Sequence, residues 1–151
     1  MRVFLCPFEG FSIAIPMDSV ASVALYTGES VEYNEENGQV AISLPRLFNL
    51  SEELIRHIII LKNPDGETDY NADYNDKKNN VMLFTTEIER EVDISGQQIF
   101  SLPKALSAAR FSVLFNGIQF KSNQFSDAAE TMVLLLNCKE LNRFAKKGEA
   151  L

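Results

Sequence analysis

Short apolar runs, separated by turn-forming and polar residues, follow one another along most of this chain. The first covers residues 1–6, and the second, residues 11–16, alternates Phe11, Ile13 and Ile15 with smaller residues and ends at a proline. Alternation with a period of two is typical of a strand that is buried on one face. The sequence therefore predicts that the chain opens with two strands.

The next segment, residues 17–26, predicts a short bend that leads into a strand and carries Val20, Val23 and Leu25. A helix is the alternative, because Val20, Val23 and Ala24 are spaced as on one helical face, but the run is short and rich in β-branched residues. Further strand-like runs are predicted at residues 30–33, 40–44, 56–62, 81–84, 88–94, 111–115, 118–120 and 132–136.

A nine-residue pattern occurs twice in the chain. Residues 38–46 are GQVAISLPR, and residues 96–104 are GQQIFSLPK. Each copy has a turn glycine, a short apolar run and a proline, and so predicts a turn, a buried strand and the first position of a short helix. Another strand-like run follows each copy, which indicates two related halves in one compact unit.

Turn signals and one helical signal complete the pattern. The Asn-Gly pair at residues 116–117 is the strongest two-residue hairpin signal in the chain, and residues 34–38, which also end in Asn-Gly, are a second candidate. Residues 63–80 combine turn formers, charges and amides, and predict a long acidic loop. Residues 138–147 predict a short terminal helix with basic residues in its last turn.

The expected fold class is mainly β. About ten short strands with two or three helical turns indicate two small β-barrels or one twin-barrel unit, because a parallel α/β sheet requires long crossover helices. At 151 residues the chain has the usual length of one domain and is long enough to bury a hydrophobic core.

Charge and cysteine content exclude several classes of protein. The formal net charge of −7 and the scattered positions of the 14 Lys and Arg residues argue against nucleic acid as a partner. Cys6 and Cys138 stand far apart in apolar surroundings, which favours buried thiols in a reducing compartment. No apolar run is long enough for a membrane span, and the opening residues indicate a strand rather than a signal peptide. We therefore expect a cytoplasmic protein without membrane insertion.

The sequence offers little for catalysis. His57 is the only histidine and stands in a predicted strand, so we expect a structural or surface imidazole rather than a general base. The motifs of nucleophile elbows, phosphate-binding loops, dinucleotide-binding turns and zinc proteases do not occur. We therefore predict a protein that is not an enzyme and needs no cofactor.

Acidic residues do not indicate a metal site either. In the loop at residues 63–80, a calcium-binding EF-hand would place Tyr74 where a glycine is required and Asn80 where a bidentate glutamate is required. A second acidic row alternates with apolar residues and is expected to be the solvent-exposed face of a strand; it consists of Glu89, Glu91 and Asp93. What remains is surface for protein partners, because short strands leave edges that accept another chain.

Taken in order, these features resemble the CheW-like domain of bacterial chemotaxis coupling proteins, over essentially the whole chain. Residues 3–23, VFLCPFEGFSIAIPMDSVASV, resemble the family's entry strands, turn and V-x-x-V segment, and residues 40–50, VAISLPRLFNL, resemble its next strand and short helix. Residues 88–106, IEREVDISGQQIFSLPKAL, resemble the valine-rich segment that leads to a Leu-Pro pair. FSVLFNGIQF and MVLLLNCKELN resemble the closing hairpin, strand and helix. The resemblance implies two five-stranded SH3-like barrels, packed as a single domain over residues 1–151.

The resemblance also implies a function. Members of the family are non-catalytic adaptors that couple the cytoplasmic tip of a chemoreceptor to the regulatory domain of a CheA-type histidine kinase. The family's receptor-facing apolar positions match Met17 and Val20, and Val23 completes the V-x-x-V segment. An Arg-Gly pair of the family corresponds to Asn37 and Gly38, so the arginine is absent and this chain is a divergent example. We expect these five residues to bind partners.

A second hypothesis is a ligand-sensing β-barrel. Eleven phenylalanines supply apolar surface, and a groove between the two halves would take a small molecule.

Overall fold

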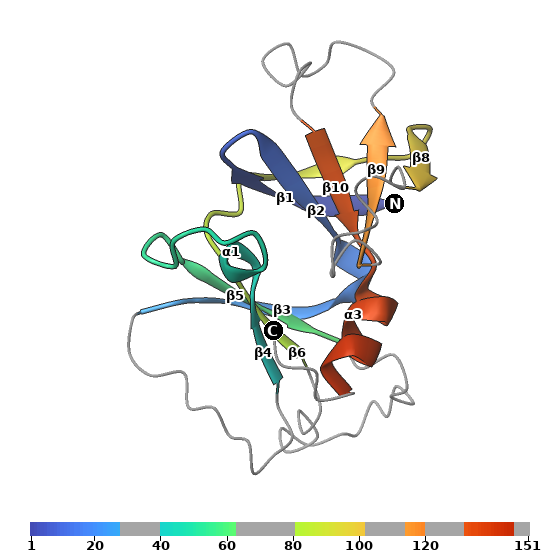
Figure 1. The fold of residues 1–151 in the computed structure, drawn as a ribbon. Helices are drawn as coiled ribbons and strands as arrows, with labels where there is room; N and C mark the ends of the chain where they lie inside the picture. Colours follow the sequence, from blue (N-terminus) through green and yellow to red (C-terminus); the bar gives the residue numbers. More distant parts are fainter. Residues whose placement is uncertain (28–39, 63–80, 102–113, 120–131, 147–151) are drawn as a thin grey trace. The chain divides into compact units, whose positions relative to one another are not determined.

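Ten strands and short helical elements make up the part of the chain that the computed structural model describes, namely residues 1–27, 40–62, 81–101, 114–119 and 132–146 (Figure 1). The strands are β1 (Arg2–Phe8), β2 (Phe11–Pro16), β3 (Val20–Leu25), β4 (Val40–Ser43), β5 (His57–Leu61), β6 (Val81–Thr85), β7 (Arg90–Asp93), β8 (Gln98–Ser101), β9 (Phe115–Gln119) and β10 (Met132–Leu136). The helical elements are the 3-10 turn η1 (Met17–Ser19), α1 (Leu44–Leu47) and α3 (Cys138–Lys146). The prediction of a mainly β chain with short strands is confirmed.

The chain divides into two compact units, and each unit combines two separate stretches of sequence. The first unit contains Met1–Asp18 and Ile88–Leu141, and the second contains Ser19–Glu87 and Asn142–Leu151. Among the described residues, one sheet has six strands and the other has four, where the resemblance implied five and five. That the two units form a single domain stays a prediction.

The first unit is built on the six-stranded sheet, in the order β7-β1-β2-β10-β9-β8. Strands β2 and β10 run parallel, and the other neighbours are antiparallel. One face carries a buried apolar cluster that includes Val3, Leu5, Ala14, Ile94, Ile118, Val133 and Leu135. On β1 and β2 the intervening residues Cys6 and Ile13 are also fully buried. The central strands are therefore covered on both faces, which explains their nearly continuous apolar sequences.

The hairpin predicted at Asn116 and Gly117 is wrong. Both residues lie inside β9, opposite Leu135 and Leu134 of β10 on one side and opposite residues of β8 on the other. A local turn preference does not decide the structure of a segment that has strand partners on both edges, because the two ladders provide hydrogen-bond partners for its backbone. Gly117 is buried between its two neighbouring strands.

The second unit is built on the four-stranded sheet, in the order β3-β5-β6-β4. Its central strands bury Ile59, Leu61 and Leu83 completely on one face. The opposite face has a smaller cluster of Ile58, Met82 and Phe84, with Tyr26 packed against it. The predicted coverage of the Ile58–Leu61 run on both faces is confirmed.

Helix α1 shows how local sequence determines both of its ends. Ser43 is the N-cap, and its hydroxyl accepts a hydrogen bond from the Arg46 N–H at 3.3 Å. Pro45 occupies the first turn, where its missing N–H costs nothing. At the other end Asn49 has a positive φ of 57°, and the Leu50 N–H donates to the Pro45 carbonyl at 2.9 Å. This is a Schellman motif with asparagine in the left-handed position.

Helix α3 confirms the predicted terminal helix within the described residues. Asn137 caps it, because its side-chain oxygen accepts a hydrogen bond from the Glu140 N–H at 3.2 Å. Leu141 is fully buried and Phe144, one turn later, is nearly so. The i, i+3 spacing of these two side chains therefore produces one buried stripe.

The two copies of the repeated pattern both become edge strands, but they pair differently. The first copy forms β4, which runs parallel to β6 and continues into α1 through Pro45, as predicted. The second copy follows a turn at Gly96, which has a φ of 82°, and forms β8, which runs antiparallel to β9. Ile99 on β8 is 46% exposed, so the predicted burial is wrong for this residue. The continuation at residues 102–113 lies outside the described residues.

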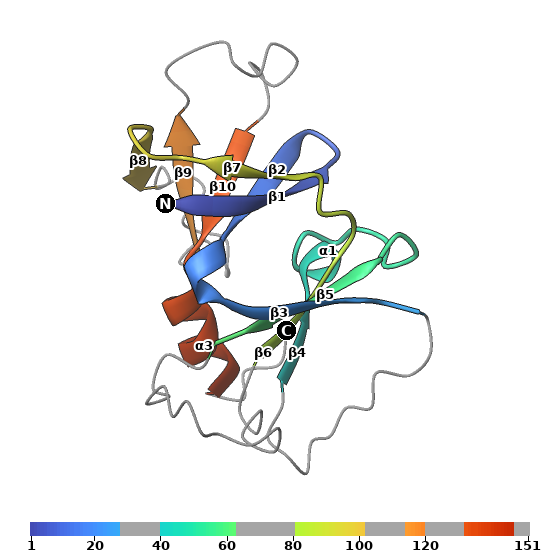
Figure 2. The ribbon, with the colours of Figure 1, turned by 180° about the vertical axis from the view of Figure 1, so that it is seen from behind.

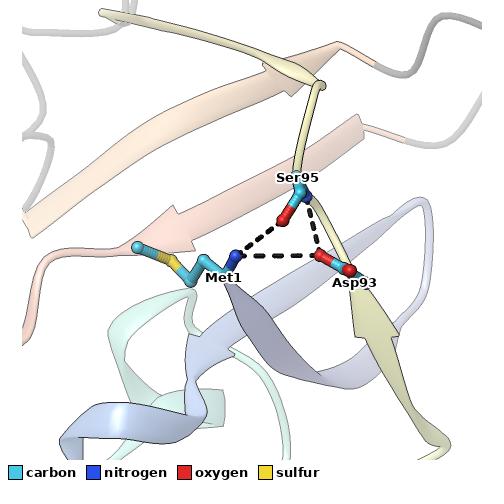
Figure 3. Close-up of polar contacts among 3 residues, drawn as sticks. All are labelled: Met1, Asp93 and Ser95. Atoms are coloured by element: carbon cyan, nitrogen blue, oxygen red, sulfur yellow. Dashed lines mark hydrogen bonds and ion pairs between the residues drawn. The ribbon is translucent and has the colours of Figure 1, made fainter.

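The start of β1 is joined to the end of β7 by polar contacts (Figure 3). The Met1 amino group donates a hydrogen bond to Ser95 Oγ at 2.9 Å and lies 3.7 Å from Asp93 Oδ1. Asp93 Oδ1 also accepts a hydrogen bond from the Ser95 N–H at 2.9 Å. The hydroxyl and N–H of Ser95 hold the pKa of Asp93 below its ordinary value.

Candidate protein-binding edge

Three of the five predicted partner-binding residues lie in consecutive elements. Met17 is in η1, and Val20 and Val23 are in β3. Within the described residues β3 ends its sheet, with β5 as its one strand neighbour, and Figure 2 shows it beside β5. Met17 and Val20 are half-buried, whereas Val23 is 41% exposed. The predicted segment is therefore a sheet edge that solvent reaches.

A β-bulge puts Val20 and Val23 on the same face of β3. The pairing with β5 shifts between Val20 and Ser22, so that Ala21 is the extra residue of the bulge. In a regular strand, two side chains three positions apart point to opposite faces. The extra residue of the bulge brings Val20 and Val23 back to the same face. Leu25, two positions beyond Val23, belongs to the same face. The aligned side chains of Val20, Val23 and Leu25 are called the β3 stripe below.

The β3 stripe continues the buried face of its sheet into solvent. Val20, Val23 and Leu25 stand opposite Leu61, Ile59 and His57 of β5, respectively. Ile59 and Leu61 are fully buried, but the exposed fraction of the neighbouring Leu25 reaches 73%. One exposed leucine needs no explanation, whereas aligned apolar side chains at an open edge are typical of an interaction surface.

No strand among the described residues pairs with the outer side of β3. The Tyr26 N–H donates to the Arg56 carbonyl at 2.7 Å and the Lys62 N–H donates to the Ser19 carbonyl at 2.8 Å, so Ser19 and Tyr26, on either side of β3, direct backbone groups toward the strand of β5. Residues along an antiparallel strand alternate between hydrogen-bonded and non-hydrogen-bonded pairs. Ser22 and Ala24 therefore direct their backbone groups toward β5, and Val23 and Leu25 direct theirs away from it. The outer edge presents the N–H and C=O groups of these two stripe residues.

The other edge strands differ from β3 in length or charge. β7 carries Arg90, Glu91 and Asp93 among its four residues, and charges on an edge discourage pairing with another chain. β4 and β8 each have four residues, and a short edge offers few backbone groups. β3 has six residues, VASVAL, none of them charged, and five are exposed. Of the described edges, β3 is the one with the fewest features that prevent strand pairing.

The charged residues near β3 in the sequence are all acidic. Between Arg2 and Arg46 it contains no lysine, arginine or histidine. The same interval contains the acidic residues Glu9, Asp18, Glu29, Glu32, Glu35 and Glu36. Asp18 is exposed and precedes β3 by two positions. On the neighbouring strand, however, the exposed Arg56 and Lys62 lie at the two ends of β5, and their backbone groups bond to Tyr26 and Ser19, so charges of both signs lie near β3.

The sequence predicts only part of this candidate edge. Leu25 was not predicted as a binding residue, although its period-two spacing from Val23 placed it on the same strand face. Asn37 and Gly38 lie outside the described residues, as does the acidic loop at residues 63–80. Their predicted roles stay predictions.

The described residues show a structural environment for His57. Its side chain is half-buried, and Nδ1 lies 3.2 Å from the Thr86 carbonyl oxygen.

No group of three or more His, Cys, Asp or Glu side chains in the described ranges is placed to hold a metal ion. No helix in those ranges is long and apolar enough to cross a membrane. The small-molecule sensor, which requires a groove between the halves, stays a prediction.

Comparison by sequence finds no similar protein, whereas comparison by structure finds a similar fold. No family model matches the chain, and no curated protein matches its sequence. The solved structure of the scaffolding protein TtCheW from Thermoanaerobacter tengcongensis is similar, with a TM-score of 0.52 and 10% sequence identity, over 90% of this chain and 83% of that chain. This likeness supports the CheW-like fold that the sequence resemblance implied.

Proposed function

We propose that this protein is a non-catalytic adaptor of a chemotaxis-type signalling assembly, which joins the cytoplasmic tip of a chemoreceptor to the regulatory domain of a CheA-type histidine kinase. The observation that carries the proposal is the β3 stripe, an aligned set of apolar side chains on an uncharged sheet edge, of which Val23 and Leu25 are exposed. The fold likeness to a scaffolding protein supports it. The protein acts in the cytoplasm, where both partners present these parts.

The chemistry of the described surface suits binding better than catalysis. Val20, Val23 and Leu25 contribute apolar contact area, and Met17 precedes them in η1. Burial of such side chains at an interface stabilises a complex by about 25 cal/mol for each Å² of apolar surface removed from water. The stripe requires no movement of the core to become accessible, because Val23 and Leu25 are already exposed.

The test is a titration of the full chain with a CheA-type regulatory domain and with a soluble receptor-tip fragment, by calorimetry or fluorescence anisotropy. We expect Val23→Asp to weaken binding to at least one of these partners by roughly tenfold or more. A carboxylate at the centre of an apolar contact loses its water without gaining a partner, at a cost of at least about 1–3 kcal/mol.

Ile99→Asp is the matched control. Ile99 is also β-branched, also on an edge strand, and has a similar exposed fraction of 46%, but it lies on β8 in the other unit. Its substitution should leave both affinities unchanged. Equal losses from the two variants would remove β3 as the site, and a wild-type chain that binds neither partner at high micromolar concentration would remove the adaptor function.

A further inference from the structure

We propose that Asn116 is a site of spontaneous deamidation, which the pairing of β9 with its neighbouring strands keeps closed, and that modification to isoaspartate prevents β9 from pairing again. An asparagine followed by glycine is the sequence most prone to this reaction, and Asn116 and Gly117 form such a pair inside a strand. The inference concerns the first unit and is independent of the adaptor function.

The reaction is an intramolecular ring closure. The Gly117 backbone nitrogen attacks the side-chain carbonyl carbon of Asn116, an N–C bond forms, and ammonia leaves with the proton of that nitrogen. Water then opens the resulting succinimide ring at either carbonyl, which gives aspartate or isoaspartate. Glycine favours the attack because it has no Cβ and its backbone rotates easily. Water is the one co-reactant, so the reaction needs no enzyme.

The register of β9 shows what holds the attacking nitrogen. The Asn137 N–H donates to the Leu114 carbonyl at 2.7 Å, one position beyond the paired residues of β10 and β9. Backbone direction alternates along an antiparallel strand. Asn116 therefore directs its N–H and C=O toward β10, and Gly117 directs its own toward Phe100 of β8. The nitrogen that must attack is held in the ladder between β9 and β8.

The extended backbone also keeps the reacting atoms apart. The five-membered ring contains the Cα and the carbonyl carbon of Asn116, so the ψ angle of this residue must rotate far from the strand value of about +135° before the ring closes. That rotation turns the peptide group between Asn116 and Gly117 out of both ladders. Gly117 is buried and Asn116 is half-buried. Deamidation in the folded chain therefore requires local opening of β9.

Strand β8 is the weaker of the two neighbours of β9. It has four residues, ends the sheet among the described residues, and exposes Gln98 and Ile99. β10, by contrast, has strands on both sides and four buried residues. Segments with few buried contacts open at a lower free energy than the strands inside a sheet. Release of β8 is therefore the first step of the opening.

The isoaspartyl product cannot return to the same register. Its backbone passes through the former side-chain carbonyl and gains one carbon atom, which displaces the residues that follow in β9. Ile118 is 6% exposed and belongs to the buried cluster of the first unit, so the displacement disturbs that cluster. The aspartyl product keeps the register and only places a carboxylate opposite Leu135.

The test is peptide mapping of the full chain by mass spectrometry after incubation at mildly alkaline pH, with and without urea. We expect Asn116 to deamidate at least about tenfold more slowly in the folded chain than in urea. The sequence pair Asn37 and Gly38 is the reference in urea, where both pairs should react at similar rates. At low urea concentrations, the deamidation of Asn116 and the hydrogen exchange of the Gly117 amide should increase together.

Two neighbouring exposed residues of β8 provide matched variants. Gln98→Pro removes an N–H that the register directs toward β9, whereas Ile99→Pro removes one that is directed away from it. We expect Asn116 to deamidate about twofold to tenfold faster in Gln98→Pro than in wild type, because one ladder hydrogen bond is lost, and at nearly the wild-type rate in Ile99→Pro. Circular dichroism verifies that both variants are folded.

Equal deamidation rates with and without urea overturn the proposal, and so does an Asn116 that stays unmodified in urea. Equal rates in the two proline variants remove β8 as the strand that protects the site. If Gln98→Pro does not fold, the comparison of Gly117 exchange with deamidation decides the same point, and rates that change independently overturn it.

The purified isoaspartyl chain tests the loss of pairing. It should melt below Asn116→Asp, which carries the same charge on an ordinary backbone, and its Ile118 amide should lose protection from hydrogen exchange. The same melting temperature and the same protection in both chains would show that β9 pairs again after modification.

Discussion

Ile59 and Ile60 are adjacent residues of one type on opposite faces of β5, and their truncation tests the register of the second sheet. Ile59 is fully buried opposite Val23 and Leu83, whereas Ile60 is partly exposed and lies beside the smaller cluster. Ile59→Ala removes three buried carbons, at about 0.8 kcal/mol each, and leaves a cavity. The expected loss in the free energy of unfolding is about 3–4 kcal/mol, and about half of that for Ile60→Ala.

Urea unfolding followed by circular dichroism measures both losses, with unchanged slopes indicating that the denatured state is the same. The melting temperature of Ile59→Ala should fall by roughly 10 °C, since 1 kcal/mol corresponds to about 2–4 °C in a chain of this length. If Ile60→Ala costs as much as Ile59→Ala, the register is wrong. A one-residue slip of β5 exchanges its two faces, and the β3 stripe would lose its alignment with the buried face.

Two further substitutions test local features of the fold. Asn49→Gly should raise the melting temperature slightly and Asn49→Ala should lower it, because Asn49 is in the left-handed region with a φ of 57°; equal melting temperatures would contradict the Schellman end of α1. Ser95 holds the pKa of Asp93 below the ordinary value of 3.8, so the stability from ionised Asp93 is present above about pH 4 and is lost as pH falls through the folded pKa. Asp93→Asn should therefore melt below wild type at neutral pH, with a difference that disappears in strong acid, and a difference that grows there would refute this assignment.

The sequence predicted those elements whose pattern is set by burial alone. Both Phe11–Pro16 and Met132–Leu136 are strands because their apolar residues fit the interior of a sheet, although the alternation in Phe11–Pro16 predicts one covered face and Ile13, Ala14 and Ile15 show that both are covered. The hairpin predicted at Asn116 and Gly117 is wrong because a turn preference is local, whereas the position of β9 between β10 and β8 depends on residues far away in sequence. The different pairings of the two repeat copies depend on such distant partners too.

The sequence points to the segment of the proposed binding edge but not to its geometry. Val20 and Val23 are separated by three positions, a spacing that fits neither a regular strand face nor a short helix decisively. Only the register shift at Ala21 shows that they share a face and that Leu25 joins them. The direction of the Val23 and Leu25 backbone groups follows from pairing with β5, and no sequence pattern carries that information.

The charge of the chain explains how the exposed edge strand β3 avoids pairing with a second copy. An uncharged six-residue edge with exposed apolar side chains is a risk for self-association, and the charges on β7 show the usual protection. β3 lacks charges of its own, but it lies in a stretch where every ionisable side chain between Arg2 and Arg46 other than Cys6 and tyrosine is acidic. The net charge of −7 opposes association between two copies without blocking the edge. Raising the salt concentration should therefore promote association between copies, which sedimentation of the full chain measures, and a chain that stays monomeric at every salt concentration would contradict this explanation.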